Sequence, residues 1–165
     1  MKTLAVGAIF ALLISGVAQA EDYSSELSAI SLNESSGGVY KEHKRMTKGM
    51  HKGTVAAGSY GLMPLTAKDI VRGNPSLKAK YGFLLTMDND SVTGALNTNA
   101  SMDREIATTM WKGLRKHLDR YRAAYAWLNG SKRAGTLSEE VILGHYYVQR
   151  FSHGFIDGTL HASRK

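Results

Sequence analysis

Apolar residues recur at helical spacing through the second half of the chain. The clearest stripe runs at steps of three and four residues, through Ala107, Met110, Leu114, Leu118, Tyr121, Tyr125 and Leu128. Ser101 is suited to cap a helix at its start, and Asp103 and Glu105 lie in the first turn, where the helix dipole favours acids. Asn129-Gly130 is a typical helix end. The pattern predicts one long helix over 101–128.

The same reasoning predicts further helices along a chain that has no proline after Pro75. One starts at Thr136 or Ser138 and continues to Gly154, and shorter ones cover 25–34, 66–71 (with Thr66 as cap) and 76–85. Between 37 and 61 the periodicity disappears and six glycines occur, which predicts a long loop or a small hairpin. Long loops in compact domains are often functional. The fold class is therefore expected to be mostly α, in a single domain.

The first twenty residues have the layout of a secretory signal peptide. Lys2 gives a positive start, 4–17 is an apolar stretch without charge, and Val17-Ala18-Gln19-Ala20 offers small residues at a cleavage site. We expect cleavage after Ala20 and a secreted or periplasmic domain over 21–165. No later segment reaches transmembrane length. Removing residues 1–20, which hold one basic residue, leaves 145 residues and a formal net charge of +6.

Composition narrows the function classes. A hydrophobic content of 43% is ordinary for a folded domain and excludes wholesale disorder. The absence of cysteine excludes disulfides, thiolate metal sites and a cysteine nucleophile. A net charge of +7 calls for an anionic partner: nucleic acid, a membrane face or a wall polymer. Export makes nucleic acid an improbable target and favours an anionic polymer outside the cytoplasm.

The basic residues gather in two places. Between 40 and 62, Glu42 is the only acid among five basic residues: Lys41, Lys44, Arg45, Lys48 and Lys52. Between 111 and 133, Asp119 is the only acid among seven: Lys112, Arg115, Lys116, Arg120, Arg122, Lys132 and Arg133. The second run is read as the solvated face of an amphipathic helix. The first lies in the expected loop, where a groove for an anionic ligand is the better interpretation.

Common catalytic and metal-binding motifs are missing. The six histidines share no compact ligand spacing, so no metal or cofactor is expected, and neither a His-Glu-x-x-His, a Gly-x-Ser-x-Gly nor a P-loop occurs. Glu34 is the more interesting residue, because it closes a short apolar helix and precedes Ser35-Ser36-Gly37-Gly38. The helix dipole and apolar neighbours would both raise the pKa of such a carboxyl group, as a general acid requires. The alternative is an exposed glutamate at a helix end.

The order of several motifs resembles the lysozyme-like superfamily, in the branch of soluble lytic transglycosylases and goose-type lysozymes. Glu34-Ser35 resembles the Glu-Ser motif of that branch, and 58–63 is similar to its Gly-x-x-Gly-Leu-Met-Gln. Pro64-Leu65-Thr66-Ala67 matches the following Pro-x-Thr-Ala after a three-residue deletion. Ala124-Tyr125 with Asn129-Gly130 resembles Ala-Tyr-Asn-x-Gly, and Tyr147-Val148 the closing Tyr-Val. The resemblance covers most of the chain after residue 20.

The resemblance implies a single lysozyme-like domain that cuts the β-1,4 bond between muramic acid and glucosamine in peptidoglycan, as a monomer and without a cofactor. Glu34 would be the general acid and base. Sugar contacts would come from Ser59, Tyr60, Leu62, Met63, Tyr125 and Tyr147, although Tyr125 also suits core packing. If a second carboxylate positions water, the product is hydrolytic, and Glu42 is its first candidate. Asp88, Asp90 and Asp103 follow, with surface solvation as the alternative for each.

The chain also departs from the family pattern. The Gln after Gly-Leu-Met and the hydrophobic-Met pair behind it are absent, and Ala126 stands where Ala-Tyr is followed by Asn in the family. These changes leave the acid in place and alter the groove, which favours a variant substrate such as partly N-deacetylated peptidoglycan. Two other classes stay open: a non-catalytic wall or polyanion binder on a degenerate lysozyme-like scaffold, and an inhibitor or surface-interaction protein.

Overall fold

The computed structural model describes residues 22–41 and 43–162, with side-chain burial up to residue 154. The expected signal peptide and Glu42 lie outside the described residues. Within them the chain forms helices and loops without a named strand, and an isolated antiparallel bridge joins Ala57 to Leu62. The prediction of a mostly α protein is confirmed. In this part of the chain no helix is both long and apolar enough to cross a bilayer.

The described helices follow one another closely after a long loop over 36–63. In chain order they are α1 (Ser24–Ser35), α2 (Pro64–Gly73), α3 (Pro75–Tyr81), the 3₁₀ helix η1 (Gly82–Leu85), α4 (Asn89–Thr98), α5 (Ala100–Arg115), α6 (Arg120–Asn129), α7 (Ser131–Ala134), α8 (Glu139–Leu143) and α9 (Tyr146–Ala162).

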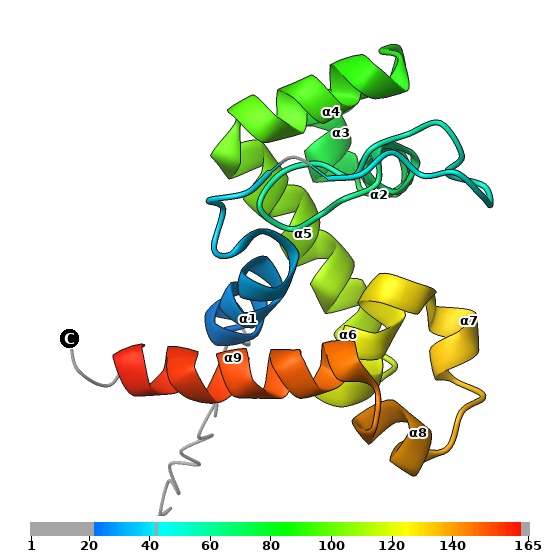
Figure 1. Cartoon of the computed structure of the whole chain (residues 1–165). Helices are drawn as coiled ribbons and strands as arrows, with labels where there is room; N and C mark the ends of the chain where they lie inside the picture. The colour runs from blue at the N-terminus through cyan, green and yellow to red at the C-terminus, as the bar shows by residue number, and fades with distance from the viewer. Residues whose placement is uncertain (1–21, 42, 163–165) are drawn as a thin grey trace, which may run out of the picture.

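Helix α5 connects two groups of helices (Figure 1). On one side lie α2, α3 and α4, with the long loop beside them; on the other lie α6, α7 and α8. Helix α1 crosses α9 and shares more contacts with it than with any other helix. The packing of α1 on α9 therefore brings the first and the last described helices together.

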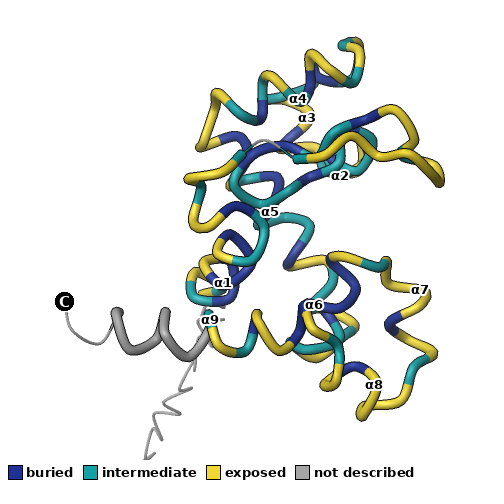
Figure 2. The backbone as a smooth tube through the Cα atoms, viewed as in Figure 1, coloured by how far each residue is buried: buried dark blue, intermediate teal, exposed yellow. Residues whose placement is uncertain are grey.

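Aromatic side chains join the helices at the centre of the core. Trp111 on α5 is fully buried, and its ring lies 6.0 Å from that of Trp127 and 5.7 Å from that of Phe151. These contacts link α5, α6 and α9. In Figure 2 the buried stretches of these helices face one another, while α7 and α8 are largely exposed.

A buried charged cluster ties α1 to α5 and α6. Glu26, only 6% exposed, accepts a hydrogen bond from Trp111 Nε1 (2.6 Å) and lies 3.4 Å from Arg115 Nε and 3.8 Å from Arg120 Nε. Arg122 donates to the carbonyl groups of residues 134 and 137. Three cations of the 111–133 run therefore hold the fold together, and the prediction that this run is only a solvated face is wrong for them.

The single helix predicted over 101–128 is in fact two, α5 and α6. The chain leaves the helix after Arg115, and Asp119 starts a new one by accepting hydrogen bonds from the backbone N–H groups of Tyr121 and Arg122, both 2.9 Å. The start also differs, because Asn99 rather than Ser101 caps α5. The predicted end at Asn129 is confirmed.

The last predicted helix is likewise divided. Ser138 caps α8 as predicted, but α8 ends at Leu143 and α9 begins at Tyr146. The prediction that Thr66 caps a helix was wrong, because α2 starts at Pro64. Helix α4 was missed, since no helix was predicted in its region. In α4, Asp88 supplies the cap through the N–H of Ser91 (2.7 Å).

Candidate active site

Glu34 lies in the last turn of α1, next to a sharp change in chain direction. Ser36 adopts the left-handed conformation (φ 52°), and its N–H together with that of Gly37 satisfies the last carbonyl groups of the helix. Gly37 and Gly38 follow with φ of 75° and 91°. The glycines after the Glu-Ser pair therefore let the chain turn away and leave the Glu34 side chain at the end of the helix.

The Glu34 carboxylate is partly buried and held between two distant segments. Tyr147, at the start of α9, donates its hydroxyl to Glu34 Oε1 at 2.6 Å. Gly61 lies against the other oxygen so closely that a Cβ at this position would be 2.4 Å from Oε2. Asn33 donates to the carbonyl of Tyr147 (3.1 Å), which fixes the same junction of α1 and α9.

Burial is the main cause that raises the pKa of Glu34 above its ordinary value. The hydrogen bond from Tyr147 and the charge of Arg150 act in the opposite direction and only partly offset it. Burial and the neighbouring carboxylate hold the pKa of Tyr147 well above its ordinary value, so its hydroxyl remains a donor. A carboxyl group with these surroundings keeps its proton to higher pH than an exposed glutamate, as a general acid requires.

The segment 57–62 forms a tight turn beside Glu34. The backbone groups of Ala57 and Leu62 exchange two hydrogen bonds of 2.9 Å. Gly58 (φ 72°) and Gly61 (φ 62°) occupy left-handed positions that a side chain would strain. Glycine is required at position 61 for two reasons: the backbone has a positive φ, and the Glu34 carboxylate fills the space that a side chain would need.

Ser35 joins α1 to this turn, which gives a physical reason for the Glu-Ser pair. Its hydroxyl donates to the carbonyl of Ser59 (2.7 Å), and the N–H of Gly38 donates to the Ser35 oxygen at the same distance. Ser35 is buried, so both bonds are shielded from water. Because Ser35 is the neighbour of Glu34, the bond fixes the carboxylate relative to the turn.

Asp103 on α5 holds the turn from its other side. It is 1% exposed; its Oδ2 accepts the N–H of Ser59 at 2.6 Å, and its Oδ1 has no hydrogen-bond partner among the described residues. Asn97 accepts the N–H of Gly58 (2.7 Å). Burial raises the pKa of Asp103 to about 6, against the lowering effects of the Ser59 N–H and Lys41. The expectation that Asp103 is solvated is wrong, whereas Asp88 and Asp90 are exposed.

The other predicted sugar contacts fall into two groups. Ser59 and Tyr60 are half-buried on the turn, and Trp127 Nε1 donates to the carbonyl of Tyr60 at 3.2 Å. Met63 is half-buried beside them and precedes α2. Leu62, at 2% exposure, is part of the core.

Tyr125 is also in the core, at 2% exposure, and its ring meets the edge of His145 at 4.8 Å. In the described part of the chain no hydrogen bond reaches its hydroxyl group. Among the predicted sugar contacts, Tyr147 is the one that binds the Glu34 carboxylate directly.

The sequence did not indicate that Asn97 and Trp127 hold this arrangement, and it named Asp103 only as a candidate second carboxylate, with surface solvation as the alternative. Asp103 carried a signal, as an acid in a first helical turn, but that signal is shared by most solvated helix starts. Asn97 and Trp127 carried none, because their contacts join segments more than 35 residues apart.

Elsewhere in the structure, polar side chains that line a cavity are engaged in structural contacts. A cavity of about 340 Å³ lies between α3 and α5, but Asn74 in its wall caps α3, and Glu105 is paired with Lys80 and Tyr81. Among the described residues no three His, Asp or Glu side chains are grouped so as to hold a metal ion.

No known protein-family model matches the chain, and neither does any curated protein or solved structure. The geometry around Glu34 is therefore the basis for assigning a function.

Proposed function

We propose that the protein is a peptidoglycan-cleaving enzyme of lysozyme or lytic transglycosylase type, with Glu34 as its general acid and base. The observation that carries the proposal is the surroundings of Glu34: a partly buried carboxyl group with a raised pKa, held by Tyr147 and seated against Gly61. Glycosidases need such a group, because the leaving oxygen must receive a proton as the glycosidic bond breaks.

The two carboxylate oxygens have different tasks in this proposal. Tyr147 donates to Oε1, so Oε2 carries the proton that is transferred to the glycosidic oxygen. Gly61 presents only backbone to Oε2. Ser35 and Asp103 act as positioning residues, because both bind the backbone of Ser59 within the same turn.

The reaction can end in two ways after the bond breaks. If Glu34 next takes the proton from the muramoyl 6-hydroxyl group, the product is a 1,6-anhydro sugar. If a second carboxylate positions water, the product is a reducing sugar. Glu42 lies outside the described residues, and Asp103 is already bound to the N–H of Ser59. The mass of the product distinguishes the outcomes, since the anhydro product lacks one water.

The experiment compares wild type with Glu34→Gln on purified sacculi, both native and N-deacetylated, by turbidity and by product mass. Glu140→Gln, an exposed glutamate on α8, is the matched control. We expect wild type and Glu140→Gln to release soluble fragments and Glu34→Gln to release none. Release by Glu34→Gln at the wild-type rate would refute the assignment of the acid.

If wild type releases nothing from either wall, the enzymatic proposal fails. Co-sedimentation with sacculi without release would then identify the alternative, a wall-binding protein.

A further inference from the structure

The loop between α1 and α2 contains a projecting turn, which we call the basic turn and define as residues 43–54. It is closed at its base by two backbone hydrogen bonds of 2.8 Å, from Met46 N–H to the Thr54 carbonyl and from Gly53 N–H to the Met46 carbonyl. Gly49 and Gly53 have positive φ (74° and 81°), which permits the reversal. The basic turn is therefore a defined structure and not an open loop.

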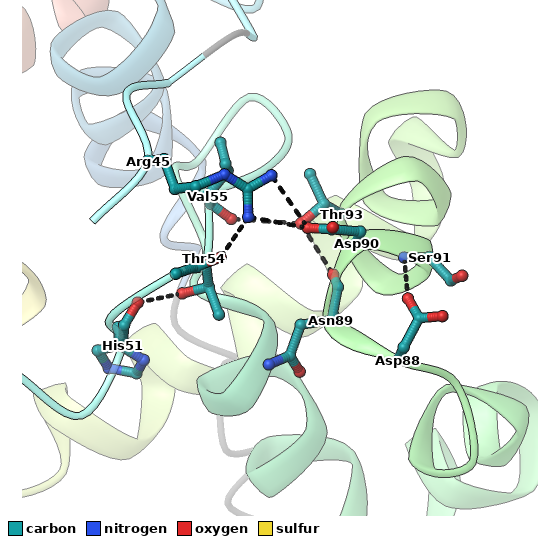
Figure 3. Close-up of polar contacts among 10 residues, drawn as sticks. Arg45, His51, Thr54, Val55, Asp88, Asn89, Asp90, Ser91 and Thr93 are labelled. Atoms are coloured by element: carbon teal, nitrogen blue, oxygen red, sulfur yellow. Dashed lines mark hydrogen bonds and ion pairs between the residues drawn. The ribbon is translucent and has the colours of Figure 1, made fainter. Parts of the chain in front are cut away.

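Helix α4 fixes the basic turn at its base (Figure 3). Arg45 pairs with Asp90 at 3.4 Å and also donates to the carbonyl of Gly53. Thr93 donates to the carbonyl of Val55 at 3.3 Å, and Thr54 to that of His51 at 2.6 Å. These contacts occupy the base of the turn and leave residues 47–52 to extend past it, at the edge of the molecule beyond α2 (Figure 1).

The basic turn carries cations and exposed apolar side chains, with Lys44 and Met46 at its base and Lys48, Met50 and Lys52 in the part that extends past it. Met50 is 82% exposed and Met46 is 44% exposed. Lys44, Lys48 and Lys52 are exposed, and none of their ammonium groups makes a hydrogen bond or ion pair to the described residues. The grouping of three exposed lysines with the 82% exposed Met50 on one projecting turn is the pattern of an interaction surface.

We infer that the basic turn docks on an anionic phospholipid surface. The three lysines would lie at the lipid phosphates, and Met50 would enter the boundary between headgroups and acyl chains. A wall polymer would satisfy the cations equally well but would offer nothing to an exposed methionine between Lys48 and Lys52. This inference goes beyond the proposed function and does not depend on it, because Glu34 and the basic turn share no contact in the described structure.

The size of the effect follows from general values. A lysine near an anionic membrane surface strengthens binding about five-fold, so removing three weakens it roughly 100-fold. Replacing Met50 by a polar residue of similar size weakens binding about five- to ten-fold. The lysine contribution decreases with salt, since the Debye length shortens from about 10 Å at 0.1 M to about 3 Å at 1 M. The Met50 contribution to binding does not decrease with salt, because it is apolar.

The experiment is co-sedimentation of the full secreted chain with phosphatidylcholine vesicles, with and without about one third phosphatidylglycerol. The charge variant is Lys44→Gln/Lys48→Gln/Lys52→Gln. Its control removes the same charge from exposed lysines on α5, directly after α5 and on α7: Lys112→Gln/Lys116→Gln/Lys132→Gln. Met50→Gln is compared with Val141→Gln, which changes an apolar residue on α8 that is 51% exposed.

We expect binding only to the anionic vesicles, weakened roughly 100-fold in the basic-turn charge variant and about five- to ten-fold in Met50→Gln, and unchanged in both controls. A Met50→Trp variant should show a blue-shifted emission on the same vesicles, since Trp111 and Trp127 are already buried. Absence of wild-type binding at low salt, equal losses in variants and controls, or an unaffected Met50→Gln would each overturn the inference. Binding to sacculi alone would identify a polymer site and would also overturn it.

The vesicle experiment can fail independently of the proposed function. Glu34→Gln should bind vesicles like wild type, so a protein that binds lipid and cleaves no glycan would refute only the enzymatic proposal.

Discussion

The hydrogen bond between Tyr147 and Glu34 can be tested by removing one oxygen atom. Tyr147→Phe keeps the ring, which is 4% exposed and packed in the core, and deletes only the hydroxyl group that donates to Glu34 Oε1 at 2.6 Å. The variant therefore leaves the packing of α9 on α1 in place. What changes is the stability of the charged form of Glu34.

The energetic consequence depends on pH. A hydrogen bond to a charged group contributes about 1.5–3 kcal/mol, and one between neutral groups about 1 kcal/mol. Burial already raises the pKa of Glu34, and loss of the donor raises it further. A carboxyl group with a raised folded-state pKa stabilises the fold below its unfolded pKa and loses that contribution as pH rises through the folded-state pKa. The deficit of Tyr147→Phe must therefore grow with pH.

Thermal unfolding of the two proteins from acid to mildly alkaline pH measures this deficit. For a chain of this size, 1 kcal/mol corresponds to roughly 3 °C in Tm. We expect Tyr147→Phe to unfold about 3 °C below wild type near pH 4 and about 5–9 °C below it near pH 8. Tyr146→Phe, at a neighbouring tyrosine that is 60% exposed, is the control and should change little at either pH.

A double-mutant cycle with Glu34→Gln isolates the pair. In the Glu34→Gln background the Tyr147→Phe deficit should lose its pH dependence, because no charge remains to be stabilised. A deficit that is constant from acid to alkaline pH in the wild-type background would refute the reasoning. It would show that the hydroxyl group does not serve the ionised carboxylate.

Three other perturbations test the site and the core. Gly61→Ala should lose roughly 2 kcal/mol or more of stability, because a Cβ would approach Glu34 Oε2 within 2.4 Å at a φ of 62°. The control Gly113→Ala, in an open helical position, should be neutral or stabilising. Equal effects of the two substitutions in chemical unfolding would contradict this. The free energy of unfolding of wild type should fall by about 3 kcal/mol as pH rises through about 6, the folded-state pKa of Asp103. Asp103→Asn should not show this fall, and a pH profile of stability equal to that of wild type would contradict the prediction. Glu26→Gln should cost about 1.5–3 kcal/mol in urea unfolding, since the buried carboxylate that pairs with the partly exposed Arg115 and Arg120 loses its charge. A cost below about 1 kcal/mol would mean that the cluster is solvated.

The positions of the helices could be predicted where apolar residues recur at helical spacing on one face. The apolar stripe from Ala107 to Leu128 continues across the break between α5 and α6, so periodicity alone reads both as one helix. What divides them is local competition: Asp119 binds two backbone N–H groups and starts a new helix. Helix α4 was missed because its sequence holds Asn, Asp, Thr and Gly, residues of low helix propensity.

The site was predictable as a set of residues but not as a geometry. Glu34 and Tyr147 were both singled out, yet their contact spans 113 residues and exists because α1 packs on α9. Asp103 was expected to be solvated, since polar first turns usually face water, but the turn at Gly58 packs directly against it. Long-range packing of this kind leaves no local pattern in the sequence.

The position of Tyr147 also sets when the site can form. Glu34 belongs to the first described helix, and its hydrogen-bond donor belongs to the last, so an incomplete chain carries the carboxylate without the partner that orients it. The junction of α1 and α9 closes only after nearly the whole chain has been synthesised and folded. Under the proposed function, proton transfer by Glu34 is thereby linked to the packing of α1 on α9, and chains that lack α9 should be inactive.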